Sequence, residues 1–200
     1  MTSAQARRDF TVSRILLRSV LATRLGVAGS ALSFVLSEYG KPLISSAAGQ
    51  PLLHFNQSHS HGAWLLGLGF ETAIGVDMET RRTVPNARRL AERVFTDTER
   101  AELTAAQRAT TEADSEDVIF LRGWTRKEAV LKATGSGFTW NARELQVGTG
   151  RGIQRVSLPR LPGQVASVSS LDLPIEGQAA VATLSTETDF TNSEFFLVEA

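Results

Sequence analysis

Several features are missing from this 200-residue chain, and each absence excludes a class of protein. There is no cysteine, which excludes a disulfide framework, a thiolate zinc site and a cysteine nucleophile. No apolar run approaches the roughly 18 residues of a membrane span, since the run at 64–70 is short and carries two glycines. No glycine-rich phosphate loop of the P-loop or dinucleotide type occurs. We therefore expect a soluble, cytoplasmic protein.

The formal net charge is also zero, because 21 basic side chains balance 21 acidic ones. This balance argues against general binding to nucleic acid or to membranes. The distribution is uneven, since the first 70 residues carry six basic and two acidic side chains. Lysine is scarce, with three residues against eighteen arginines, so the few lysines could mark positions that need a compact ammonium group. They are Lys41, Lys127 and Lys132.

The length and the hydrophobic fraction of 42% describe one globular domain, or two small ones packed together. The first 25 residues hold five arginines and one aspartate, a composition also found in organelle transit peptides. Apolar residues at helical spacing from Phe10 to Leu25, followed by Gly26, favour instead a helix that docks on a core.

Further along the chain, strand and helix patterns alternate. We expect strands at 33–39, 54–60, 63–70, 72–79, 146–147, 165–170 and 179–184, helices at 84–108 and 118–134, and an exposed loop at 110–117. The segments 54–60 and 63–70 should form a hairpin, with 72–79 as the third strand of the same sheet. This order predicts an α+β fold of two similar halves, residues 1–71 and 72–200.

The strand Ile74-Gly75-Val76-Asp77-Met78-Glu79 carries the clearest chemical signal. Its period of two places Asp77 and Glu79 on one face, with their side chains roughly 6–7 Å apart. Two carboxylates at this spacing repel each other unless a cation joins them, and hard oxygen ligands suit Mg²⁺. The alternative is an acidic strand edge that faces solvent.

The helix around residues 124–132 adds a second group. Trp124, Glu128 and Lys132 are four residues apart and share one helix face. A glutamate four residues before a lysine is also an ordinary stabilising helix pair. Beside the first two carboxylates, however, a third carboxylate and an ammonium group are what metal-assisted phosphoryl transfer requires.

All three histidines fall between residues 54 and 61. His54, His59 and His61 could ligate zinc, although no further ligand completes the set. Ser58 and His59 could instead hold a phosphate on the hairpin, together with arginines of the first helix.

At this point the motifs resemble a known family. The segments 75–79 and 124–132 are similar to the paired signature of 4′-phosphopantetheinyl transferases. Residues 40–42 (Gly-Lys-Pro) and 55–60 (Phe-Asn-Gln-Ser-His-Ser) fit the upstream motifs of the surfactin-type group, and 95–99 fits the segment between the signatures. The match runs in order from about residue 7 to about residue 140.

The resemblance implies a pseudo-twofold α+β monomer with its active site in the cleft between two subdomains. Such an enzyme moves the phosphopantetheine arm of coenzyme A onto a serine of an apo acyl, peptidyl or aryl carrier protein and releases adenosine 3′,5′-bisphosphate. Mg²⁺, or Mn²⁺ in its place, would be held by Asp77, Glu79 and Glu128. Lys132 would assist the leaving group, and Glu99, or Glu128 through a water, would take the proton from the serine.

The resemblance also assigns residues to coenzyme A. Lys41 and Pro42 would border the adenine, and Ser58 and His59 would hold phosphate. The family usually has a strand and a basic stretch before the helix that here begins near residue 7. We therefore expect a reduced 3′-phosphate site in which Arg7, or its neighbour Arg8, is the nearest substitute.

Two other classes stay open from the sequence. One is a zinc hydrolase built on the three histidines. The other is a shortened, inactive relative of the transferases that still binds coenzyme A or a carrier protein.

Overall fold

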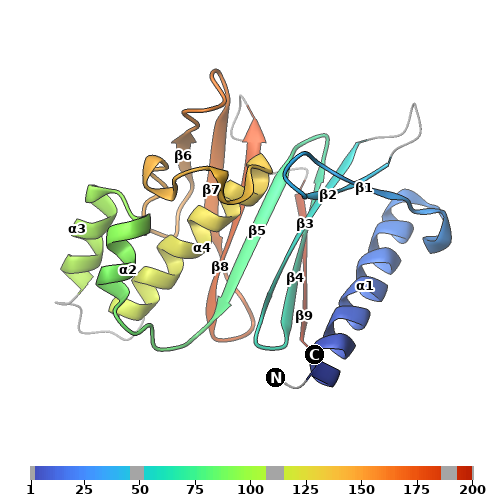
Figure 1. The fold of residues 1–200 in the computed structure, drawn as a ribbon, viewed down its shortest axis with the longest axis horizontal. Coiled ribbons are helices and arrows are strands. Elements are labelled where there is room, and N and C mark those ends of the chain that lie inside the picture. Colours follow the sequence, from blue (N-terminus) through green and yellow to red (C-terminus); the bar gives the residue numbers. More distant parts are fainter. Residues whose placement is uncertain (1–2, 46–51, 107–114, 186–192, 200) are drawn as a thin grey trace.

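The computed structural model describes residues 3–45, 52–106, 115–185 and 193–199. In this part of the chain the fold is α+β, with helices and antiparallel sheets (Figure 1). None of its helices is long and apolar enough to cross a membrane. The helices are α1 (Ser3–Leu25), α2 (Ala87–Val94), α3 (Asp97–Ala105) and α4 (Glu116–Thr134). The strands are β1 (Phe34–Leu36), β2 (Pro42–Ile44), β3 (Leu53–Ser60), β4 (Ala63–Phe70), β5 (Ile74–Thr80), β6 (Gln154–Ser157), β7 (Val165–Leu171), β8 (Gly177–Ser185) and β9 (Ser193–Glu199).

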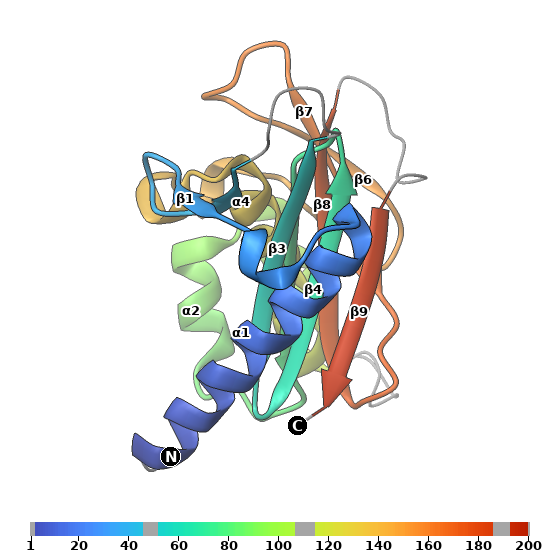
Figure 2. The same cartoon turned by 90° about the vertical axis from the view of Figure 1, so that its right-hand side faces the viewer.

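The strands form a small hairpin and two larger sheets. β1 pairs with β2, the order β3-β4-β9 makes a three-stranded sheet, and β5-β8-β7-β6 makes a four-stranded sheet. α1 crosses one face of the three-stranded sheet (Figure 2), where Leu17 and Leu21 pack on Phe55, Trp64 and Leu66. The predicted first helix is therefore confirmed, and it ends at Gly26, whose φ of +65° few other residues adopt.

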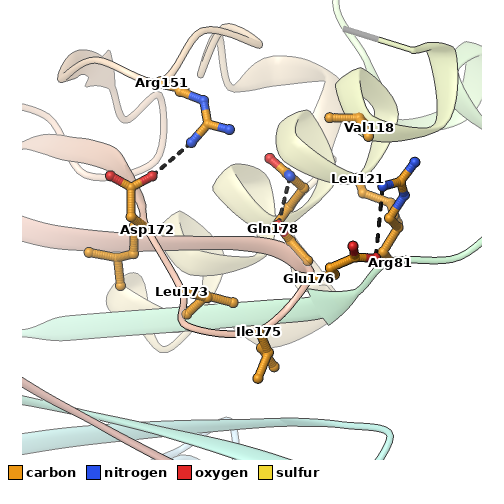
Figure 3. A pocket seen from close by; sticks show the side chains of 11 residues that line it. Arg81, Val118, Leu121, Arg151, Asp172, Leu173, Ile175, Glu176 and Gln178 are labelled. Carbon is orange, nitrogen blue, oxygen red and sulfur yellow. Dashed lines mark hydrogen bonds and ion pairs between the residues drawn. The ribbon is translucent and has the colours of Figure 1, made fainter. Parts of the chain in front are cut away.

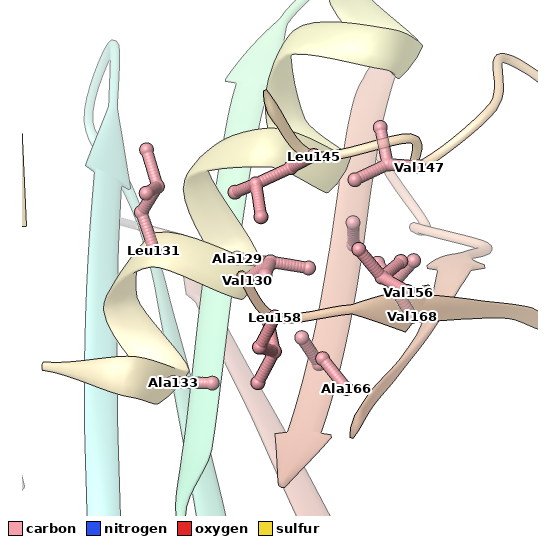
Figure 4. Close-up of a cluster of buried hydrophobic side chains, with 12 residues drawn as sticks. Ala129, Val130, Leu131, Ala133, Leu145, Val147, Val156, Leu158, Ala166 and Val168 are labelled. Carbon is pink, nitrogen blue, oxygen red and sulfur yellow. The ribbon is translucent and has the colours of Figure 1, made fainter. Parts of the chain in front are cut away.

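α4 lies along the four-stranded sheet. Its apolar side chains, including Val130 and Leu131, pack against Leu145, Val147 and the strands β6 to β8 (Figure 4). The helix predicted at 118–134 is confirmed with both ends explained: acidic residues occupy its first turn, and Gly135 ends it in the left-handed conformation.

The structure corrects three of the predicted elements. The described part of the predicted helix at 84–108 forms two helices, α2 and α3. Thr96 caps α3 by accepting the backbone N–H of Glu99, whose side chain accepts the N–H of Thr96 in return. Residues 146–147 form no strand, because the N–H of Val147 donates to the Glu99 carboxylate. The predicted loop at 110–117 lies mostly outside the described residues, and its last two residues belong to α4.

A further correction concerns β5, which was expected in the sheet of the 54–70 hairpin. It pairs instead with β8, and β9 takes the free edge of β4. β5 packs between α4 and the three-stranded sheet. Two glycines permit this close approach: a Cβ at Gly75 would overlap the backbone of α4, and one at Gly67 of β4 would lie 2.6 Å from Val76 Cγ1.

Candidate active site between β5 and α4

The two signature segments meet where β5 packs against α4. Asp77 is buried, and its Oδ1 lies 2.6 Å from the Lys132 ammonium nitrogen. Ser58 of β3 donates a hydrogen bond of 2.8 Å to the same oxygen. Lys132 also donates to the carbonyl oxygen of Val76, at 3.3 Å. Side chains of β3, β5 and α4 therefore converge on one carboxylate oxygen.

Two half-buried glutamates lie in the same region. Glu79 Oε2 is 3.4 Å from Ser60 Oγ and 3.6 Å from Arg82 Nε. Glu128 makes no hydrogen bond or ion pair with any residue that the structure describes. Its pKa is nevertheless affected by the charges of Asp77, Glu79 and Lys132. The region thus has a carboxylate without a partner close to two others.

The electrostatics of the site reflect burial and mutual repulsion. Burial raises the pKa of Asp77, and the Glu79 charge raises it further, while Lys132 and Ser58 oppose this effect. Burial also raises the pKa of Glu128, and the Asp77 charge adds to the shift. A cation near these three carboxylates would relieve the repulsion.

The donor chemistry fits Mg²⁺, which binds one or two protein carboxylates and completes its shell with water and phosphate oxygens. The described residues contain no three His, Asp or Glu side chains already grouped around a metal position. Both contacts of Asp77 engage Oδ1, so a cation that uses this oxygen must displace Lys132. The Lys132 side chain is 28% exposed, so solvent reaches it.

The histidines are placed differently from one another. His61 Nδ1 lies 2.8 Å from the Thr80 hydroxyl, and the His59 ring lies 6.4 Å from that of Trp64. Burial and the charge of Lys41 lower the pKa of His54. The absence of a three-ligand group among the described residues gives the zinc hydrolase no support.

Two of the residues assigned to coenzyme A, Lys41 and Pro42, lie at the start of β2, and Lys41 reaches the first residue of β5. Lys41, just before β2, donates to the carbonyl oxygens of Ile74 (3.0 Å), Lys132 (2.6 Å) and Ala133 (3.3 Å), and burial lowers its pKa to about 8. Pro42 begins β2 beside it. Lys41 therefore caps the carboxyl end of α4.

The proposed phosphate residues lie on β3 and α1. Ser58 is 5% exposed and, besides donating to Asp77, accepts the Met78 N–H at 3.2 Å. His59 is exposed on the same strand, and Arg7 is exposed on α1. Their roles toward coenzyme A stay predictions.

Comparison with known proteins bears on the same two segments. The sequence profile described as the 4′-phosphopantetheinyl transferase superfamily matches residues 73–187, which include β5 and α4. This chain belongs to that superfamily.

Curated members of the superfamily align with somewhat more than half of the chain. The 4′-phosphopantetheinyl transferase HetI of Nostoc is 37% identical over 131 residues, which are 66% of this chain and 53% of HetI. A 4′-phosphopantetheinyl transferase of Bacillus subtilis is 32% identical over 64% of this chain and 52% of its own length. AcpT of Salmonella typhimurium is 42% identical over 53% of this chain and 50% of its own length. The chain spans about half the length of these relatives.

The family resemblance offered Glu99 as one candidate base, and the structure places it in a closed environment. Glu99 and Lys127 form an ion pair of 2.6 Å in which both side chains are completely buried. The two carboxylate oxygens of Glu99 also accept hydrogen bonds from the backbone N–H groups of Thr96, Val147 and Gly148. All of these contacts are with groups of the protein itself, and the Glu99 side chain is completely buried.

A cavity of about 250 Å³ adjoins the Glu79 end of β5 (Figure 3). It is lined by apolar side chains of α4 and the β7–β8 connection, and by Gln178, which pairs across the sheet with Glu79. Its rim charges, Arg81 with Glu176 and Arg151 with Asp172, are paired with each other. None of the carboxylates at Asp77, Glu79 and Glu128 lines this cavity.

Sequence reasoning missed two polar residues that touch the site, Asn56 and Ser60. Asn56 accepts the N–H of Val76, and Ser60 accepts that of Thr80. Both alternate with Ser58 along β3, and this period-two polar spacing was the available signal.

Proposed function

We propose that this chain is a Mg²⁺-dependent 4′-phosphopantetheinyl transferase, which moves the phosphopantetheine arm of coenzyme A to a serine of an apo acyl, peptidyl or aryl carrier protein. The observation that carries the proposal is the cluster between β5 and α4. There Glu128, whose carboxylate has no hydrogen bond or ion pair with the described residues, lies near Asp77 and Glu79, and Lys132 is bound to Asp77. Membership of the superfamily supports the same reaction.

Asp77, Glu79 and Glu128 are the residues that would hold the cation. When bound, Mg²⁺ would neutralise charge on the pyrophosphate of coenzyme A and polarise the phosphorus that carries the pantetheine arm. Burial raises the pKa of Asp77 and of Glu128, and Lys132 only opposes this effect, so a bound cation would stabilise the ionised forms of both carboxylates.

Two residues of α4 act on the proton of the carrier serine and on the leaving group. The serine oxygen forms the new bond to phosphorus while the bond to adenosine 3′,5′-bisphosphate breaks. Glu128 accepts the serine proton, through a water, because a half-buried carboxylate with a raised pKa is suited to this task. Lys132 exchanges Asp77 for the departing phosphate and stabilises its charge.

Coenzyme A would have its adenine near Lys41 and Pro42 and its phosphates near His59 and Arg7, which are both exposed. We further propose two units that meet near residue 71 in a pseudo-twofold arrangement, acting as a monomer. In support, α1 covers the three-stranded sheet and α4 the four-stranded one, and β5 lies against both.

The test is incubation with coenzyme A, Mg²⁺ and several apo carrier proteins, followed by mass measurement of the carriers. The wild type should add phosphopantetheine to at least one of them. Glu128→Gln should slow transfer by roughly 10²-fold or more. Glu92→Gln on α2, an exposed glutamate away from the site, should have no effect. Coenzyme A binding without transfer to any carrier would instead favour an inactive relative.

A further inference from the structure

Two edge strands, β3 and β5, face each other without a backbone ladder. Their contact is made by side chains of every second residue of β3. Asn56 Oδ1 accepts the N–H of Val76 (2.8 Å), Ser58 Oγ that of Met78 (3.2 Å), and Ser60 Oγ that of Thr80 (3.0 Å). Each pair is separated by 20 residues, so the strands run in the same direction in constant register. We name these three bonds the side-chain ladder.

The ladder satisfies polar groups that would otherwise be buried without partners. Along this edge of β5 the side-chain ladder accepts hydrogen bonds from the backbone N–H groups. Two lysines donate to the backbone carbonyl oxygens of the same edge: Lys41 to that of Ile74, and Lys132 to that of Val76. An unpaired buried N–H is costly, so the edge depends on these side chains.

The same serines reach the carboxylates. Ser58 Oγ accepts from Met78 and donates to Asp77 Oδ1 at 2.8 Å. Ser60 Oγ accepts from the Thr80 N–H and lies 3.4 Å from Glu79 Oε2, and His61 Nδ1 and Thr80 Oγ1 each lie 3.3 Å from the same hydroxyl. A hydroxyl can accept from one residue and donate to the next through the same oxygen atom.

We propose that the side-chain ladder is a positioning device: it fixes β5 to β3 and, through Ser58, orients the Asp77 carboxylate for cation binding. Ser58 is a positioning residue, and its hydroxyl is already used on both sides inside the protein. The cation-binding part rests on the proposed function, whereas the joint between the strands does not.

The test compares Ser58→Ala with Ser167→Ala. Ser167 is also a buried serine, and its hydroxyl has no hydrogen-bond partner among the described residues. Amide hydrogen exchange by NMR should show Met78 exchanging at least about tenfold faster in Ser58→Ala, with no change in Ser167→Ala. Ser60→Ala should instead accelerate the amide hydrogen exchange of Thr80. Acceleration spread evenly over all amides, or none at Met78, would overturn the joint.

The second readout is Mn²⁺ titration of the protein without coenzyme A. Ser58→Ala should weaken Mn²⁺ binding by roughly tenfold, an effect typical of residues that orient metal ligands. Ser58→Thr, which keeps the hydroxyl, should restore it. Unchanged affinity in Ser58→Ala, or a wild type that binds no Mn²⁺, would overturn the positioning role. A wild type that binds Mn²⁺ as expected and modifies no carrier would contradict the proposed function alone.

Discussion

Each of the three lysines binds oxygen atoms of the protein itself, and two of them form ion pairs of equal length in different surroundings. Lys127 and Glu99 are 0% exposed, whereas Lys132 is 28% and Asp77 9% exposed at the side chain. In the buried pair every contact joins parts of the fold, while the more accessible pair lies near Glu128, which has no hydrogen bond or ion pair among the described residues. Burial thus distinguishes an enclosed ion pair from one that solvent reaches, and the difference is measurable.

Asp77→Asn should leave stability unchanged within about 1 kcal/mol at neutral pH, or raise it slightly. Burial raises the pKa of Asp77 in the folded protein, so the folded protein binds the carboxyl proton more readily than the unfolded chain does. The contribution of Asp77 to stability therefore falls as pH rises from the unfolded pKa to the higher folded pKa. At neutral pH the ionised carboxylate lowers the free energy of unfolding. Urea unfolding measures this, with Leu65→Ala as a core control expected to lose about 2–5 kcal/mol. A loss equal to that of the control would make Asp77 structural.

Glu99→Gln should lose about 3–5 kcal/mol, because it leaves the Lys127 charge buried without a counter-charge. Gln keeps an acceptor for the N–H of Val147, so the loss reports the charge. Adding Lys127→Met should recover part of the stability, and the same unfolding experiment shows this. If Glu99→Gln were as stable as the wild type and inactive, Glu99 would be the base after all.

At the scale of elements, local sequence signals predicted what depends on local geometry. The period of two along residues 74–79 placed Asp77 and Glu79 on one face, and the spacing of four on α4 aligned Glu128 with Lys132. The sequence could not show that β5 leaves the hairpin sheet for β8, because strand pairing depends on distant residues. Nor could it show that Glu99 holds residues 147–148, a contact that spans about 50 positions and suppresses the expected strand.

The burial of Lys41 at the end of α4 predicts a pH effect. Its pKa is lowered from 10.5 to about 8, so between these values the unfolded chain keeps a proton that the folded protein has lost. The contribution of Lys41 to stability therefore rises with pH, by about 2 kcal/mol from about pH 7 to about pH 9.5. The Lys41→Met variant has no titrating group at this position, so its stability should not show this increase between the two pH values. Urea unfolding of both proteins at the two pH values checks it, and a constant difference between them would refute the lowered pKa.

At the scale of the whole molecule, β5 joins the two sheets. One face of β5 packs on α4 at Gly75, and the other packs its apolar side chains against β4 near Gly67. The site needs both contacts, because Asp77 lies on β5, Glu128 and Lys132 lie on α4, and Ser58 belongs to the three-stranded sheet.

Alanine substitutions at these two glycines should therefore have unequal effects. At Gly75 the new Cβ would overlap the backbone of Ala129 and Ala133, so α4 must move away from β5 and carry Lys132 with it. We expect a loss of about 3 kcal/mol or more together with loss of Mn²⁺ binding. At Gly67 the obstacle is the Val76 side chain, which can shift in part, so a loss of about 1–3 kcal/mol is expected. Gly150→Ala, with nothing within 4 Å of its Cβ, is the matched control. Thermal unfolding and Mn²⁺ titration of the three variants test this order, and a Gly75→Ala protein that binds Mn²⁺ like the control would show that the site does not depend on the close packing of α4 on β5.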